Sequence, residues 1–177
     1  HNKNITNSFM RSATLKGIAC HTADDAGSVG PDPIFGWGLL NAKKAAETLT
    51  NNGLSSWVSE ERLNQNQTYT ITVKSLGTMP LIASASWTDV PGDPNNGQRP
   101  ANDLQRALVN DLDVRVLKGG QTYYPWVLNP FFLQGGAVQD DNPFDNIESV
   151  DVVDPQGTYT IVISHKGNLV GGEQNYS

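Results

Sequence analysis

The hydrophobic periodicity of the chain changes near residue 50, and this change constrains the fold more than any other feature. Before it, apolar residues recur at helical spacing; after it, they alternate with polar residues, as in half-buried strands. Strands are expected at 68–73, 81–87, 108–117, 122–124, 147–153 and 159–163. No helical pattern separates them, so their pairing should be antiparallel. The pattern predicts a mainly β fold, an antiparallel β-sandwich or jelly-roll-like domain preceded by a short helical segment.

Two helices are expected in the first fifty residues, joined by a loop rich in Gly, Asp and Pro. Asn7 or Ser8 is a suitable cap for the first helix, in which Gly17 would allow close packing. Asn41 is a suitable cap for the second helix, which should end at residues 51–53, Asn-Asn-Gly.

The second helix carries a narrow stripe of small apolar residues at helical spacing, formed by Ala42, Ala45, Ala46 and Leu49. Two such helices bury too little area to be stable alone, so they should pack on the sandwich or on a further partner. We therefore expect a helical unit over residues 1–53 and a β-sandwich over residues 54–177. The opening His-Asn-Lys, without an initiator Met, suggests a piece of a longer protein.

Charge and composition exclude several classes of protein. The 177 residues include 12 basic and 18 acidic side chains, for a net charge of −6. An acidic surface repels phosphate backbones, so nucleic acid is not an expected partner. No apolar run approaches the roughly 18 residues that a membrane span needs. The single cysteine cannot form an internal disulfide.

A self-contained catalytic triad is not expected. His21 lies close in sequence to Asp24 and Asp25, but no serine has the Gly-flanked turn that exposes a nucleophilic hydroxyl. Cys20 follows an apolar helix and is expected to be a small buried side chain without thiolate character. The sequence predicts no catalytic residue.

Acidic residues gather in two places. Asp111 and Asp113 share one face of a predicted strand, and a long connection holds a second group formed by Asp140, Asp141, Asn142, Asp145, Asn146 and Glu148. Together they could supply the oxygen ligands that Ca²⁺ requires. A solvated acidic loop explains the same residues equally well. A paired-carboxylate glycosidase site is also open, because Trp87, Tyr123, Tyr124 and Trp126 could hold a sugar.

Residues 30–49, GPDPIFGWGLLNAKKAAETL, resemble the closing segment of a subtilisin-like serine endopeptidase domain. In that family the pattern Gly-x-Gly-x-x-Asn-Ala begins the last helix, and Gly36, Gly38, Asn41 and Ala42 match it. The preceding SFMRSATLKGIACHTADDAG is similar to the helix and strand that follow the family's nucleophile helix. Three later segments, ALVNDLDVRVLKGGQTYYPW, DNPFDNIESVDV and PQGTYTIVISHKG, resemble the C-terminal β-sandwich of a secreted branch of these enzymes.

The resemblance implies that this chain is the C-terminal part of a secreted or cell-surface endopeptidase. The Ser-His-Asp triad would lie upstream, so the chain alone should be inactive and its role structural. In this branch the sandwich holds calcium, which favours a structural Ca²⁺ over a solvated loop. The candidate ligands are Asp111, Asp113 in the NDLD match, Asn129, Asp141, Asn142, Asp145 and Asn146.

The implied partners are the rest of the catalytic domain and a protein or peptide substrate bound by that missing part. The alternative function is a carbohydrate- or surface-binding module that targets the enzyme. An exposed coplanar pair among Trp87, Tyr123, Tyr124 and Trp126 would favour this alternative, and burial of all four would argue against it.

Overall fold

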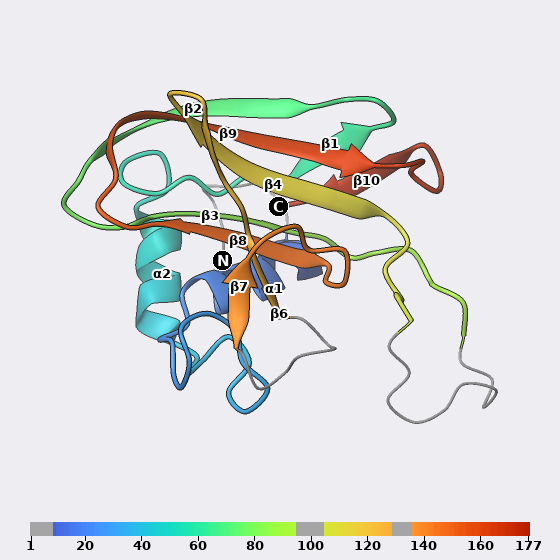
Figure 1. The fold of residues 1–177 in the computed structure, drawn as a ribbon, viewed down its shortest axis with the longest axis horizontal. Helices are drawn as coiled ribbons and strands as arrows, with labels where there is room; N and C mark the ends of the chain where they lie inside the picture. Colours follow the sequence, from blue (N-terminus) through green and yellow to red (C-terminus); the bar gives the residue numbers. More distant parts are fainter. Residues whose placement is uncertain (1–8, 95–104, 129–135) are drawn as a thin grey trace.

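The computed structural model describes residues 9–94, 105–128 and 136–177 (Figure 1). These residues form a mainly β fold with antiparallel sheets, which confirms the predicted class. The helices are α1 (Ser12–His21) and α2 (Ala42–Thr50). The strands are β1 (Glu61–Asn64), β2 (Tyr69–Leu76), β3 (Leu81–Ser86), β4 (Asp111–Lys118), β5 (Gln121–Tyr123), β6 (Trp126–Leu128), β7 (Ala137–Gln139), β8 (Ile147–Val152), β9 (Gln156–Lys166) and β10 (Glu173–Tyr176).

The strands build two facing layers. One layer is the four-stranded sheet β2-β9-β4-β5, and the other contains the pair β3-β8 (Figure 1). The pair β1-β10 continues the second layer, because Ser86 and Ser177 exchange two backbone hydrogen bonds where β3 meets the end of β10. Helix α1 packs against β3, on the side away from the first layer. The described part of the chain is therefore a sandwich with a helical segment on one outer face.

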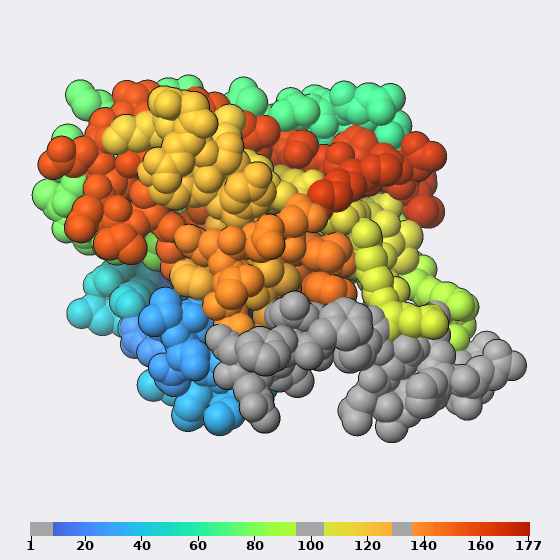
Figure 2. All heavy atoms as spheres, viewed as in Figure 1, coloured from blue at the N-terminus to red at the C-terminus, as the bar shows by residue number. Residues whose placement is uncertain are grey.

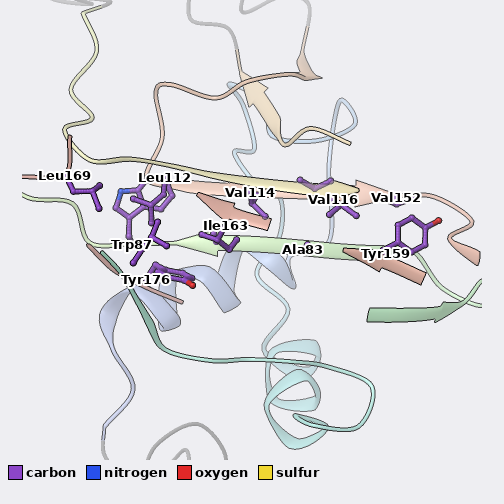
Figure 3. Packing of buried hydrophobic residues seen from close by; sticks show 13 residues of the cluster. Ala83, Trp87, Leu112, Val114, Val116, Val152, Tyr159, Ile163, Leu169 and Tyr176 are labelled. Carbon is purple, nitrogen blue, oxygen red and sulfur yellow. The ribbon is translucent and has the colours of Figure 1, made fainter. Parts of the chain in front are cut away.

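The hydrophobic core lies between the two layers (Figure 3). Leu112, Val114 and Val116 point into it from β4 and are fully buried. Trp87 follows β3, is also fully buried, and donates a hydrogen bond from Nε1 to the carbonyl of Asn110 at 2.9 Å. The alternation of residues along 108–117 thus places its apolar half in the core, as a period of two requires.

A buried polar hub ties the start of β4 to the C-terminal strand. Asn110 is fully buried, donates to Gln174 Oε1 at 2.8 Å and accepts from the backbone N–H of Val170. The carboxylate of Asp89 accepts from the backbone N–H groups of Val109 and Asn110. These bonds satisfy polar groups that would otherwise be costly to bury. Residues 108–110 therefore form a junction that precedes β4. The sequence predicted that the strand begins at residue 108, but β4 begins at Asp111.

Helix α1 begins later than the sequence suggests. It starts at Ser12, with Arg11 as an N-cap residue that makes no side-chain cap hydrogen bond, and the predicted caps Asn7 and Ser8 lie outside the described residues. The backbone N–H of Arg11 instead donates to the carboxylate of Glu60, and the hydroxyl of Thr14 donates to the same carboxylate oxygen. A distant carboxylate thus satisfies the helix end that a local cap was expected to satisfy.

Helix α2 has the predicted cap and an unexpected environment. The side chain of Asn41 accepts from the backbone N–H of Lys44 at 2.9 Å, which confirms the expected N-cap. No residue of α2 is buried, although its small-residue stripe was expected to pack on a neighbour. Within the described residues α2 packs against α1, and its stripe is only partly covered: Ala45 and Leu49 are half-buried, and Ala42 and Ala46 are exposed.

Candidate functional site

The outer face of β4 carries the candidate site. Asp111, Asp113 and Arg115 alternate with the core residues of this strand and project from the opposite face. Both aspartates are nevertheless buried, at 1% and 5% exposure. Their burial shows that other side chains cover this face, although the alternation suggested a solvated acidic surface.

The ammonium group of Lys166 lies among three carboxylates. Its Nζ is 2.6 Å from an oxygen of Asp141, 3.0 Å from Asp113 Oδ1 and 3.8 Å from Asp111 Oδ2. It donates to both carboxylate oxygens of Asp141. Asp111 and Lys166 are directly paired residues of β4 and β9, so the sheet register brings them together. These hydrogen bonds keep Lys166 charged by raising its pKa, against the opposing effect of its burial.

Two arginines complete the ion-pair cluster. Arg115 donates to Asp113 Oδ1 at 2.7 Å and also to Asp141. Arg106 lies 2.9 Å from Asp111 Oδ2, in a charge contact that does not have hydrogen-bond geometry. Burial raises the pKa of Asp111, and Lys166 and Arg106 oppose that rise. We call Asp111, Asp113, Asp141, Arg106, Arg115 and Lys166 the β4 ion-pair cluster.

Glu148 borders the cluster. Its Oε2 accepts from the backbone N–H of Val114 at 2.7 Å and lies 3.5 Å from the guanidinium of Arg115. Its Oε1 is buried without a hydrogen-bond partner. Burial raises the pKa of Glu148 to about 8, so its carboxyl group is mainly protonated at neutral pH. The six members of the cluster then balance, because three carboxylates face three cationic side chains.

The other predicted ligands make different contacts. Asn142 is fully buried, accepts from the backbone N–H groups of Phe144 and Asp145, and donates to Asp145 Oδ2 at 3.1 Å. Asn146 accepts two hydrogen bonds from Lys16, one at its carbonyl and one at Oδ1, both 2.7 Å long. Lys16 also donates to the carbonyl of Trp87 at 3.1 Å. A second ammonium group therefore sits in a cage of three oxygens.

The seven candidate ligands thus fall into separate groups. Asp111, Asp113 and Asp141 come together in the β4 ion-pair cluster, Asn142 pairs with Asp145, and Asn146 holds Lys16. Asn129 lies outside the described residues. Within the described ranges, no three His, Cys, Asp or Glu side chains are placed to hold one metal ion. Calcium binding stays a prediction.

Sequence reasoning missed the cations of both groups. Arg115 lies in the strand predicted over 108–117, whereas Lys166 lies three residues beyond the strand predicted over 159–163. The register of β9 against β4 pairs Lys166 with Asp111. Lys16 is 130 residues from Asn146, so no local pattern connects them. Long-range pairing of this kind is decided by packing.

His21 and His165 both make hydrogen bonds that join different parts of the fold. Nδ1 of His21 shares a 2.8 Å hydrogen bond with Ser84 Oγ, which donates to Ser149 Oγ at 2.9 Å. Burial lowers the pKa of His21, and the negative charge of Asp151 opposes this. These side chains join α1 to β3 and β8. We therefore interpret the contact as structural, and His165, which accepts from the backbone N–H of Asn66, as structural too.

The four aromatic residues considered for sugar binding do not form an exposed pair. Trp87 is in the core, Tyr123 and Trp126 are half-buried, and only Tyr124 is exposed, at 40%. Trp126 donates from Nε1 to Asp151, and Arg115 stacks 4.9 Å from the ring centre of Tyr124. Among these four residues, all of which the structure describes, there is therefore no exposed coplanar pair of the kind that would favour the carbohydrate-binding alternative.

No protein-family model matches this chain, and no curated protein matches it either. Neither helix of the described residues is long and apolar enough to cross a membrane. The functional interpretation therefore depends on the residues and their geometry.

Proposed function

We propose that this chain is the C-terminal part of a secreted subtilisin-like serine endopeptidase. In this proposal residues 1–53 complete the catalytic domain, and the β-sandwich of residues 54–177 braces it. The Ser-His-Asp triad and the peptide-binding cleft belong to the part of the enzyme that precedes this chain. The contribution of these residues is to position and stabilise that part.

The observation that carries the proposal is a set of exposed apolar side chains in the helical segment. Eight large side chains between residues 15 and 57 are more than half exposed. They are Leu15, Val29, Ile34, Phe35, Leu39, Leu40, Leu54 and Trp57. We call them the apolar layer. Figure 2 shows the helical segment, coloured blue to cyan, along one side of the molecule. So many exposed large apolar side chains within about forty residues are what a segment that packs against a further part of the protein would carry.

The geometry of the loop before α2 supports the resemblance to the subtilisin-like closing motif. Gly38 has φ +104°, and a Cβ there would lie 2.2 Å from the carbonyl oxygen of Asp24. This close approach allows Asp24 and Leu39 to exchange two backbone hydrogen bonds, each 2.8 Å long. Asn41 then caps α2 and also donates to the carboxylate of Asp24 at 2.8 Å. Two of the motif residues, Gly38 and Asn41, therefore help to hold α2 against this loop.

Complementation tests the proposal. The 177-residue chain and the upstream catalytic part, produced as separate polypeptides, should form a complex when mixed and hydrolyse casein. The chain alone should show no hydrolysis. Replacing Leu39 and Leu40 by Asp should weaken the complex and the regained activity at least tenfold, because two charges would be buried against apolar surface.

Leu76→Asp provides the matched control. Leu76 is 77% exposed at the end of β2, in the first sheet layer and outside the apolar layer. This variant should form the complex as well as the unmodified chain does. Casein hydrolysis by the purified chain alone would overturn the proposal, as would equal effects of the Leu39/Leu40 and Leu76 substitutions.

A further inference from the structure

Two oxygen clusters in this chain are each centred on a lysine. In the β4 ion-pair cluster the ammonium group of Lys166 lies within 3.0 Å of oxygens from Asp113 and Asp141. In the second cluster the ammonium group of Lys16 donates to three oxygens, from the Trp87 carbonyl and from the carbonyl and side chain of Asn146. Both clusters contain residues that the sequence predicted as calcium ligands.

The donor atoms of these clusters do not fit a calcium ion as they are arranged. Calcium takes six to eight oxygens at about 2.3–2.6 Å. Here the oxygens of Asp113 and Asp141 already accept from Lys166 and Arg115, and those of Asn146 accept from Lys16. A calcium ion bound by Asp113 and Asp141 would therefore have to displace Lys166 from their oxygens, although both oxygens of Asp111 are buried without a hydrogen-bond partner.

The charges of the β4 ion-pair cluster also disfavour a calcium ion. The three aspartates of the β4 ion-pair cluster face Arg106, Arg115 and Lys166, and Asp111 and Asp113 are almost fully buried. A divalent ion that replaced the Lys166 ammonium in this balanced set would leave one uncompensated positive charge in a partly buried site. Uncompensated charge in such a place is costly.

We propose that the ammonium groups of Lys166 and Lys16 take the place of calcium in the described part of this sandwich, so that these two oxygen clusters are held together by internal lysines and not by a bound metal. Lys166 links the loop of Asp141 to β4 and β9. Lys16 links α1 to the loop that precedes β8. Lys166 thus joins two of the segments that carry the predicted calcium ligands, β4 and the loop of Asp141, and Lys16 joins the loop of Asn146 to α1.

Thermal unfolding of the 177-residue chain, with and without calcium, tests this inference and needs no protease activity. Excess EGTA should leave the Tm of the unmodified chain unchanged, and equilibrium dialysis with ⁴⁵Ca²⁺ should detect no stoichiometric site. Lys166→Met should lower the Tm by about 5 °C or more, because it leaves buried carboxylates unbalanced. Calcium at about 5 mM, enough for a weak site, should then restore part of that loss.

Three further variants complete the design. Lys16→Met should lower the Tm, because the carbonyl and side-chain oxygens of Asn146 lose their donor. Lys166→Arg keeps the charge and should remain insensitive to calcium. Lys74→Met removes a lysine exposed on β2 and should change neither the Tm nor the response to calcium.

A fall in the Tm of the unmodified chain with EGTA would overturn the inference, as would one tightly bound calcium per chain. So would a calcium response of Lys166→Met no larger than that of Lys74→Met. If Lys166→Met does not fold, the EGTA and dialysis measurements on the unmodified chain still decide the matter. These outcomes are independent of whether the complementation experiment succeeds.

Discussion

The carboxyl group of Glu148 is held where a negative charge is disfavoured. One of its oxygens accepts from the backbone N–H of Val114, and the other is buried without a partner. Burial raises the pKa of Glu148 to about 8, above the value of 4.5 for an unperturbed carboxyl group. Folding therefore favours the protonated form, and this contribution to stability is present below pH 4.5 and is lost as pH rises through about 8.

Glu148→Gln should remove this dependence on pH. Glutamine keeps an oxygen that can accept from Val114 and carries no ionisable group. We expect the variant to match the unmodified chain near pH 4 and to exceed it at pH 9 by roughly 2–5 kcal/mol in the free energy of unfolding. Urea unfolding across this pH range measures the difference. Parallel stability curves for the two proteins would contradict the burial argument.

His21 makes the free energy of unfolding depend on pH in the opposite direction. Burial lowers the pKa of His21 from 6.5, so the folded chain favours the neutral ring. The unfolded chain takes up a proton more readily, and stability contributed by His21 is lost as pH falls below about 6.5. Measurements on Glu148→Gln should therefore be compared at matched pH, where His21 contributes equally to both proteins.

At the scale of elements, the contact between α1 and β3 depends on a missing side chain. A Cβ on Gly17 would lie 2.3 Å from Ser86 Oγ and 3.2 Å from Ser86 Cβ. That serine is buried and donates from Oγ to the carbonyl of Ala13 at 2.8 Å. The sequence predicted Gly17 as a packing point, and the structure confirms it and identifies the neighbour.

Gly17→Ala should destabilise the chain although alanine is the better helix former by about 1 kcal/mol. The added methyl group would push α1 away from β3, and we expect a net loss of roughly 1–3 kcal/mol. Thermal or urea unfolding measures this loss. Combining Gly17→Ala with Ser86→Ala removes the closest atom, so the double variant should lose less than the sum of the two single losses. Simple additivity would contradict the proposed contact.

The whole molecule is closed by its last strand. β10 pairs with β1 along its full length, from Glu61 opposite Tyr176 to Asn64 opposite Glu173. Tyr176 and Gln174 are buried, and Ser177 bonds to Ser86 in the neighbouring strand. The pair β1-β10 therefore joins a strand that precedes every strand of the first layer to one that follows them all.

Deleting residues 173–177 should abolish cooperative unfolding of the chain. The deletion removes the backbone partner of β1, exposes the fully buried Trp87 and leaves Asn110 without Gln174. Near-ultraviolet circular dichroism and a thermal scan measure the loss of packed structure.

Arg62→Ala is the control for this deletion. It removes only the exposed ion pair with Glu173, which should contribute less than about 1 kcal/mol, and it leaves the strand pairing intact. A deletion variant that unfolds as cooperatively as Arg62→Ala would show that β10 does not close the fold.

Alternation along the chain was sufficient to predict the principal strands. The pattern over 81–87 and 147–153 predicted β3 and β8, and the pattern over 108–117 and 122–124 predicted β4 and β5. Short strands such as β1 and β6 were missed, because three or four residues are too few to show a period. The Asn41 cap was predictable because a cap is made within one turn of helix.

The sequence by itself determined the fold class, the antiparallel pairing and the side of β4 that carries Asp111 and Asp113. These features depend on residues only a few positions apart in sequence, because the spacing of apolar and polar residues decides which face of a strand each side chain occupies. Only the tertiary structure decided that Lys166 and Lys16 occupy the oxygen clusters, that α2 packs against α1 with no residue fully buried, and that β10 closes the second layer. Each of these contacts joins segments distant in sequence, and packing alone selects such pairs.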